Sequence, residues 1–253
     1  MGGVLVDQHQ TGTAFGEDVT LVKDADDPGR PVSGETSGFL PLYCGGTAHG
    51  WNRNDLRGRG HSFFCAKPAA FYRFYRDKMV FDPKVIRPNA AHLALARLEA
   101  EGKMEGTGIV TQNIDGLHSE AGSRSVFELH GSIHRNYCTR CGRFYPLSRI
   151  MESNGDPSGV PLCSCGGIIK PDVVLYQEAL NEDVVDGAVK AIAHADLLII
   201  GGTSMTVWPA AGLVSYFKGD RTVIINRDAT AADGDADLII RQPIGQVLGS
   251  LFD

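Results

Sequence analysis

Apolar and polar residues follow one another in a regular order from residue 68 onward, and this order predicts alternating strands and helices. Runs rich in β-branched and other apolar residues predict strands at 108–110, 125–129, 195–200, 222–226 and 237–240. Apolar residues at helical spacing predict helices at 68–81, 88–102, 181–194 and 209–217, and a short helix from Ile244. This alternation is typical of an α/β fold with a doubly wound parallel sheet.

The first sixty residues give no comparable pattern. Residues 1–16 are polar and glycine-containing, so we expect no regular structure there, and residues 17–27 are expected to form a short helix. From 28 to 60 the chain is crowded with Gly, Pro and Arg and has no sustained helical or strand period. Only 39–43 has the apolar content of a strand, and its internal Pro41 favours an edge strand or none.

Polar side chains follow two neighbouring predicted strands. Gln112, Asn113 and Asp115 come after the first strand, and His130 comes after the second. Because ligands of open α/β sheets bind beyond the carboxyl ends of the strands, these residues predict a small-molecule pocket, and His130 suits proton abstraction at neutral pH. Taken alone, the polar cluster is more typical of an ordinary turn, and a lone histidine is more often a hydrogen-bonded structural residue than a base. Two strands that both end in polar residues favour a functional site.

Two later strands also end in glycine or polar residues. The first is followed by Gly202, Thr203 and Ser204, and the second ends in Asn226. Glycines at a strand end, with hydroxyl groups opening the next helix, offer backbone N–H groups to phosphate or ribose, although a glycine pair indicates tight packing as readily. The four strand ends together outline one dinucleotide-sized crevice.

An extended apolar run at 168–178 lies between the two regions just described. Such a run can offer its backbone to a bound peptide by strand addition. The pattern indicates an internal linker strand equally well, and both interpretations stay open.

Four of the six cysteines are clustered as Cys138-x-x-Cys141 and Cys163-x-Cys165 across a glycine-rich insert. This spacing predicts a tetrahedral zinc-ribbon site rather than a disulfide pair. Four thiolate ligands leave no coordination position for water or substrate, so the zinc is expected to be structural. The two isolated cysteines, at 44 and 65, are expected to be small buried apolar residues rather than nucleophiles.

Composition limits the function classes. The chain has 253 residues, 43% hydrophobic and 21% charged, which is enough for one α/β domain with a smaller module. No apolar run is long enough to span a bilayer, and residues 1–6 lack the features of a secretory signal, so we expect a cytoplasmic protein without a membrane partner. The net charge of −6 argues against direct nucleic-acid binding and disfavours the remaining class of zinc-ribbon nucleic-acid binders.

Several motifs in one order make the chain similar to the sirtuin family of NAD-dependent protein-lysine deacylases, from about His61 to the C-terminus. Besides the cysteine tetrad, the motifs are Thr111-Gln112-Asn113-Ile114-Asp115, Leu129-His130-Gly131-Ser132, Lys170-Pro171-Asp172-Val173-Val174, Gly202-Thr203-Ser204 and Ile225-Asn226. The resemblance implies a Rossmann-like domain, a smaller zinc-ribbon and helical domain, and NAD consumed as co-substrate. The implied substrates are acyl-lysine proteins or peptides, and the implied products are nicotinamide, free lysine and O-acyl-ADP-ribose.

The resemblance also implies residue roles. His130 would be the catalytic base that deprotonates a ribose hydroxyl. The implied cofactor-binding residues are Asn113 and Asp115 on the nicotinamide side, Gln112 and Asn226 at the ribose groups, and Gly202, Thr203 and Ser204 at the adenosine half. Val173 and Val174 would line the acyl-lysine tunnel and pair with substrate backbone, and Gln177 stands where many relatives have glycine.

The resemblance fails near the N-terminus, where the family has a first strand, a Gly-Ala-Gly-x-Ser loop and Pro-Asp-Phe-Arg. We expect all three to be absent from this chain, and one hypothesis is that 28–60 is read out of frame. The alternative to an active deacylase is therefore a catalytically impaired NAD- or ADP-ribose-binding relative. The expected division is 1–27, an atypical 28–60, helical 61–88, Rossmann-type 89–133 with 172–253, and zinc-ribbon 134–171.

Overall fold

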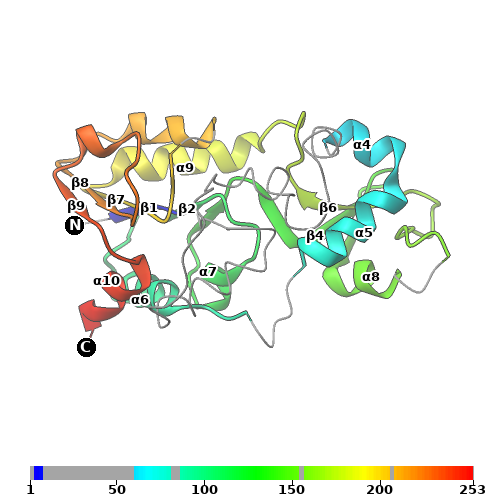
Figure 1. The fold of residues 1–253 in the computed structure, drawn as a ribbon, viewed down its shortest axis with the longest axis horizontal. Helices are drawn as coiled ribbons and strands as arrows, with labels where there is room; N and C mark the ends of the chain where they lie inside the picture. The colour runs from blue at the N-terminus through cyan, green and yellow to red at the C-terminus, as the bar shows by residue number, and fades with distance from the viewer. Residues whose placement is uncertain (1–2, 8–59, 81–85, 154–156, 206–207, 253) are drawn as a thin grey trace.

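The computed structural model describes residues 3–7, 60–80, 86–153, 157–205 and 208–252. The helix expected at 17–27, the strand considered at 39–43 and Cys44 lie outside these residues. The described chain forms two units, one built on a six-stranded sheet and one on a three-stranded sheet (Figure 1). No helix in the described ranges is long and apolar enough to cross a membrane.

The larger sheet is parallel throughout and has the strand order β3-β2-β1-β7-β8-β9. Its strands are β1 (Gly3–Asp7), β2 (Ile109–Thr111), β3 (Val126–Glu128), β7 (Leu197–Gly201), β8 (Arg221–Ile225) and β9 (Leu238–Ile240). From β1 the next strands, β2 and β3, are added on one side, whereas β7, β8 and β9 are added on the other side. The position between β1 and β7 is therefore the topological switch point, where doubly wound sheets bind ligands. The predicted fold class is confirmed, and so are the five predicted strands.

The strand β1 corrects the prediction for the N-terminus. Residues 1–16 were expected to lack regular structure, yet Gly3–Asp7 form a central strand paired with both β2 and β7. The strand expected to be absent is thus present, and it precedes the 28–60 segment. Its pairing partners come more than 100 residues later in the chain, so the short Gly-Val-Leu-Val-Asp run carries little local signal of its position.

Helices cover both faces of the larger sheet (Figure 1). On one face lie α9 (Glu182–His194) and η2 (Ala210–Tyr216), and on the other lie α6 (Ala90–Ala100) and α10 (Ile244–Gly249). Successive strand residues feed the two cores, since Val110 packs with α9 and η2 whereas Ile109 packs with α6 and α10. These helices confirm the predictions, except that residues 210–216 form a 3₁₀ helix.

The smaller unit packs helices against the three-stranded sheet β5-β4-β6. Its strands are β4 (Gly131–Cys138), β5 (Phe144–Pro146) and β6 (Ile169–Val173), and its helices are α4 (His61–Ala66), α5 (Pro68–Lys78) and α8 (Leu147–Glu152). The predicted helix α5 supplies an aromatic stripe to this core, in which Phe71, Tyr72 and Tyr75 are fully buried. The remaining short elements are α7 (Leu117–Glu120), η3 (Asp233–Asp235) and η4 (Ser250–Phe252).

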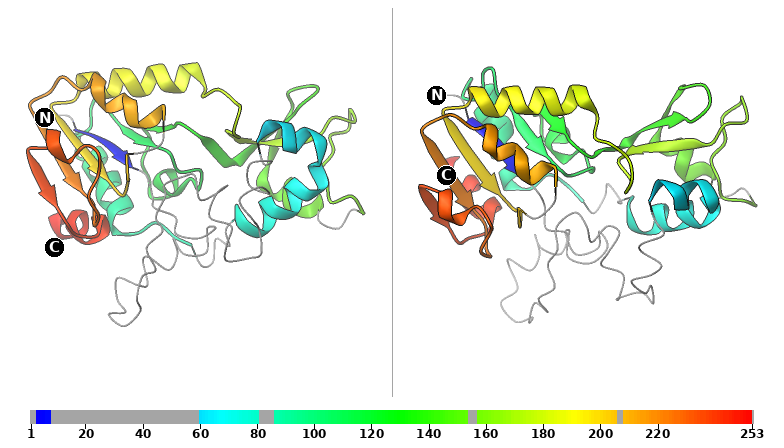
Figure 2. Two further views of the ribbon diagram at one scale, coloured as in Figure 1. Left: turned by 45° about the horizontal axis from the view of Figure 1, so that its top comes forward. Right: turned by 90° about the horizontal axis from the view of Figure 1, so that it is seen from above.

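Two strands connect the units, as both views in Figure 2 show. β4 and β6 run antiparallel across the boundaries expected at 133/134 and 171/172. Arg135 on β4 joins the units through ion pairs with Glu128 of β3, at 2.6 Å, and Asp172 of β6, at 2.8 Å. The position of the small unit is therefore tied to the edge strand of the large sheet.

Candidate active site at the switch point

The strands of the large sheet end at one level. Register partners join their last residues across the sheet in the order Glu128, Thr111, Asp7, Gly201, Ile225, Ile240. Gln112, His130, Gly202 and Asn226 follow four of these ends within two residues. The structure thus brings the predicted residues to one edge, spread over about 19 Å from β3 to β8 at the usual strand spacing.

The loop after β2 is held in a defined turn. The Thr111 hydroxyl accepts the backbone N–H of Asn113 at 3.1 Å, and the Asp115 carboxylate accepts that of Leu117 at 2.9 Å, at the start of α7. Asn113 is buried and Asp115 is half-buried. One carboxylate oxygen of Asp115 therefore supports the turn itself.

His130 is buried, with 5% of its surface exposed. Its Nδ1 lies 3.0 Å from the carbonyl oxygen of Gln112, which can only accept, so in the neutral ring Nδ1 carries the hydrogen and Nε2 carries the lone pair. Burial lowers the pKa of His130 to about 4, against the opposing effect of the Gln112 carbonyl. The imidazole is therefore a neutral proton acceptor at physiological pH.

Gln112 provides a test of whether this edge suits a polar ligand. The residue is 1% exposed, and neither its amide oxygen nor its amide nitrogen has a hydrogen-bond partner among the described residues. A buried amide without partners costs about 1–3 kcal/mol, so such a group beside a crevice is suited to hydrogen-bond a bound ligand. The position beside the switch point and the donor and acceptor on one amide fit the hydroxyl groups of a nucleotide ribose.

On the far side of the switch point the chain turns sharply after β7. Gly202 has φ 62° and Met205 has φ 56°, and the fully buried Thr203 hydroxyl accepts the Met205 N–H at 3.0 Å. Asn226 after β8 is also buried, and its Nδ2 donates to the Asp228 carbonyl at 2.9 Å. The left-handed Met205 was not foreseen, because nothing in its residue type indicates that conformation.

The residues expected to meet acyl-lysine lie next to His130. Val173 is buried opposite Gly131 in the β4–β6 pair, and the Val174 N–H donates to the His130 carbonyl at 3.0 Å. Among the described strands β6 pairs only with β4, and outside that pair the Ile169 N–H donates to the Pro161 carbonyl at 2.9 Å and Lys170 Nζ donates to the Val173 carbonyl at 3.0 Å.

Gln177 adopts the backbone conformation that a glycine would favour. Its φ is 77°, and its side-chain oxygen accepts the Ser62 N–H at the start of α4, at 3.1 Å. Gly60 permits this contact, since a Cβ there would lie 2.8 Å from both the Gln177 amide oxygen and the Tyr176 carbonyl. A side-chain hydrogen bond thus accompanies the strained backbone, which the sequence alone could not indicate.

The four clustered cysteines form a candidate zinc centre at the far end of β4. Their sulfur atoms all lie within 4.8 Å of one another, with Cys138–Cys165 at 3.4 Å and Cys141–Cys163 at 3.7 Å. Zn–S bonds of 2.3 Å in a tetrahedron require sulfur separations of about 3.8 Å, so the donor set fits zinc. In the register of β4 with β6, the ligand Cys138 lies four β6 residues, about 13 Å, from Gly131, the residue that follows His130, which fits a structural role.

Comparison with known proteins decides the family. A model described as the Sir2 family matches residues 57–209, more than half of the chain. The chain belongs to the Sir2 family, the sirtuins. This sirtuin is 53% identical over 193 residues to the NAD-dependent protein deacetylase of Clostridium acetobutylicum, covering 76% of either chain.

Solved sirtuin structures have the same fold. One described as Sir2 bound to acetylated peptide has TM-score 0.70 and 34% identity, covering 75% of this chain and 79% of the other. Another, described as Sir2 with a p53 peptide and NAD+, has TM-score 0.74 and 28% identity, covering 100% and 92%. The resemblance identified from the motifs is confirmed.

Three features of this sirtuin escaped sequence reasoning. Cys65 is exposed on α4, with Sγ 3.4 Å from His61 Nε2, so the prediction that it is buried is wrong; the two residues lie one turn apart on a helix face turned outward. Arg135 and His134 on β4 make contacts between the units that no motif indicated. The sequence around these two residues does not indicate their contacts, because the groups that they bind lie in other elements of the chain.

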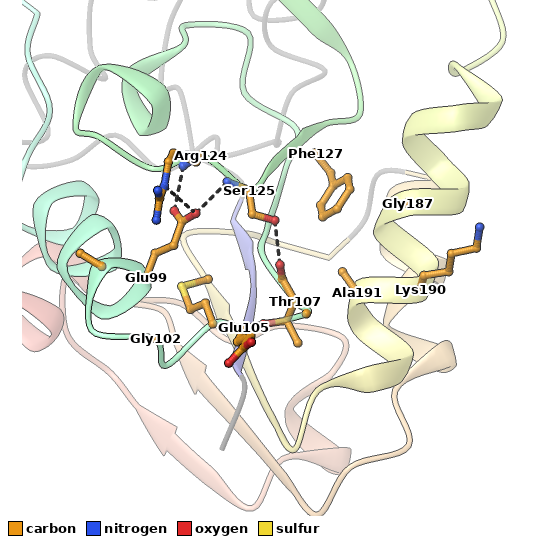
Figure 3. Close-up of a pocket in the computed structure, with 13 residues that line it drawn as sticks. Glu99, Gly102, Glu105, Thr107, Arg124, Ser125, Phe127, Gly187, Lys190 and Ala191 are labelled. Carbon is orange, nitrogen blue, oxygen red and sulfur yellow. Dashed lines mark hydrogen bonds and ion pairs between the residues drawn. The ribbon is translucent and has the colours of Figure 1, made fainter.

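A cavity of about 650 Å³ lies at the opposite end of the sheet (Figure 3). Residues that precede β2 and β3 line it, among them Thr107 and Ser125, together with Lys190 of α9. The Glu99 carboxylate closes one side by accepting the backbone N–H groups of Arg124 and Ser125, at 2.8 and 3.0 Å. This cavity is separate from the carboxyl edge, where ligands of doubly wound sheets bind.

Proposed function

We propose that this sirtuin is an NAD-dependent protein-lysine deacetylase or deacylase that releases nicotinamide, free lysine and O-acyl-ADP-ribose. The observation that carries the proposal is His130, which is buried and neutral and lies two residues beyond the carboxyl end of β3. The curated relative with 53% identity is named as an NAD-dependent protein deacetylase, which supports the same reaction.

The chain's own residues have separate tasks in this proposal. NAD would supply the ribose that takes up the acyl group, with nicotinamide as leaving group. His130 Nε2 accepts the proton of a ribose hydroxyl, and the bond from Nδ1 to Gln112 keeps the ring in the required tautomer. The Gln112 amide and Asn226 bind ribose hydroxyl groups, and Asn113 and Asp115 bind on the nicotinamide side.

The remaining predicted residues complete the binding sites. Gly202, Thr203 and Ser204 hold the adenosine half through the turn after β7. The acyl-lysine peptide binds along β6 by strand addition, with Val173 and Val174 beside the base. The cysteine tetrad holds one structural zinc.

Nicotinamide release tests the proposal. The purified chain with NAD and an acetyl-lysine peptide should release nicotinamide and deacetylated peptide in equal amounts. His130→Ala should lower the rate about 100-fold or more, the usual contribution of a general base. His194→Ala is the matched control, because His194 is an exposed histidine whose ring bonds the Lys190 carbonyl within its own helix, α9. Absence of release from the wild-type chain would refute the proposal.

One observation favours a second candidate, an impaired relative that binds nucleotide without turnover. Between β1 and α4 the sequence contains neither Gly-Ala-Gly-x-Ser nor Pro-Asp-Phe-Arg. Pre-placed backbone donors and charge of this kind contribute strongly to such sites. The two candidates separate in one comparison, since an impaired relative binds ADP-ribose in calorimetry but gains nicotinamide release only when these motifs are restored.

We further propose the domain division 61–88 with 134–171 for the small domain and 89–133 with 172–253 for the Rossmann-type domain, the first strand being added to the latter. A cytoplasmic location is also proposed, because the described cysteines are free thiols suited to zinc in a reducing compartment. Zinc analysis of protein purified under reducing conditions tests whether these thiols hold the metal.

A further inference from the structure

Residues 130–134 make three hydrogen bonds to backbone carbonyl groups of the loop that follows β2, residues 112–116. The His130 ring donates to the carbonyl of Gln112 at 3.0 Å, and the Ile133 N–H donates to the carbonyl of Ile114 at 3.0 Å. Five residues of chain around the start of β4 thereby fix the loop that follows β2. These bonds join the small unit to the nicotinamide side of the proposed site.

The third donor is the side chain of His134. Its Nε2 donates to the carbonyl of Asp115 at 2.8 Å, although the ring is exposed. Gly116 makes room for the ring, because a Cβ there would lie 2.8 Å from the imidazole, and its φ of 74° is one that glycine adopts without strain. The loop backbone and the imidazole are thus fitted to one another.

The three carbonyl acceptors differ in how they are held. Gln112 and Ile114 are bonded by the catalytic base and by a backbone N–H, neither of which can be exchanged without disturbing catalysis or the strand. Of the three donors, only the His134 ring is a side chain without a part in the proposed chemistry. It also binds the residue next to Gly116, where the loop changes direction into α7.

We infer that His134 is a positioning residue for the nicotinamide pocket: its bond to the Asp115 carbonyl holds residues 112–115 in the conformation that binds the nicotinamide end of NAD. The inference rests on the proposed function for its ligand. We call the bond from His134 Nε2 to the Asp115 carbonyl the clamp. It is present in the protein without ligand, so its effect on the loop can be measured whether or not the chain is active. Loss of the bond allows the loop to open and lowers the fraction of chains that are ready to bind.

Amide hydrogen exchange on the ligand-free, zinc-loaded chain tests the clamp. His134→Ala should speed exchange in the fragment covering 112–117 by about three- to tenfold, the effect of one lost hydrogen bond on local opening. His134→Gln, whose amide nitrogen can reach the same carbonyl, should restore the wild-type rate. His194→Ala removes a comparable bond from an exposed imidazole to a backbone carbonyl elsewhere and should leave this fragment unchanged.

Steady-state kinetics then tests the consequence for the ligand. His134→Ala should raise KM for NAD and the inhibition constant of nicotinamide by about three- to tenfold, with KM for the acetylated peptide and the zinc content unchanged. His134→Gln should return both constants toward wild type. The inference would be overturned if His134→Ala raised KM for NAD and KM for the peptide equally, or if amide exchange in 112–117 stayed at the wild-type rate.

The outcomes separate the two proposals. A wild-type chain that releases no nicotinamide refutes the proposed function, while the exchange measurement still decides the clamp. Should His134→Ala not fold, His134→Asn takes its place, because asparagine is too short to reach the Asp115 carbonyl from the same strand position. Fast exchange in that variant supports the clamp, and slow exchange refutes it.

Discussion

Lowering the pH should destabilise the ligand-free chain through His130, because the imidazole binds a proton more weakly in the folded protein than in the unfolded chain. Burial lowers the pKa of His130 from 6.5 to about 4. Its contribution to the free energy of unfolding is therefore complete above pH 6.5, decreases below that pH and is lost below pH 4. The full contribution is about 3 kcal/mol, of which about 2 kcal/mol disappears between about pH 7 and pH 5.

Urea denaturation at several pH values measures this contribution in wild type and in His130→Asn, whose side-chain nitrogen can still donate to the Gln112 carbonyl. Titrations elsewhere in the chain, including those of the cysteine cluster, cancel in the difference between the two proteins. On going from about pH 7 to pH 5, the free energy of unfolding of wild type should therefore fall by about 2 kcal/mol relative to that of His130→Asn. His194→Ala should follow the wild-type profile. Parallel profiles for wild type and His130→Asn would show that burial does not keep the imidazole neutral.

Three further predictions test the sites separately. Cys138→Ser should abolish zinc binding and unfold the small unit, as seen by metal analysis and circular dichroism. Gln177→Ala should be less stable than Gln177→Gly in urea by about 1 kcal/mol, since both lose the Ser62 bond but only alanine keeps the left-handed strain; equal stability contradicts this. Gln112→Met should stabilise the ligand-free chain by about 1–3 kcal/mol, because it removes two buried amide atoms without partners, and weaken NAD binding in calorimetry; a less stable variant contradicts this.

The alternating elements could be predicted because their signals are local. The helix at 181–194, for example, begins at Asn181, whose side chain accepts the Val184 N–H, and its apolar residues recur on the face that meets the sheet. The metal centre was likewise readable, since both pairs of ligands lie close together in sequence. Each of these features is decided by residues within a few turns of one another.

What could not be predicted depends on partners far away in the chain. The strand Gly3–Asp7 is fixed by its two neighbours in the sheet, and the backbone of Gln177 is fixed by the N-terminus of α4, more than 100 residues earlier. The protonation of His130 is decided by burial and by one carbonyl group. A motif names the residue type at such a position, but the conformation and the charge state come from tertiary contacts.

The loop after β2 is anchored through its carbonyl groups, so position and recognition are carried by different atoms of the same residues. Replacing the Gln112 side chain leaves the acceptor for His130 in place, whereas His134→Ala removes an anchor and leaves every ligand-binding side chain intact. A double-mutant cycle with Gln112→Met and His134→Ala can therefore ask whether the amide binds NAD only when the loop is held. If it does, the two losses in NAD affinity are less than additive, because a displaced amide has little left to lose. Strict additivity would mean that the loop keeps its place without His134.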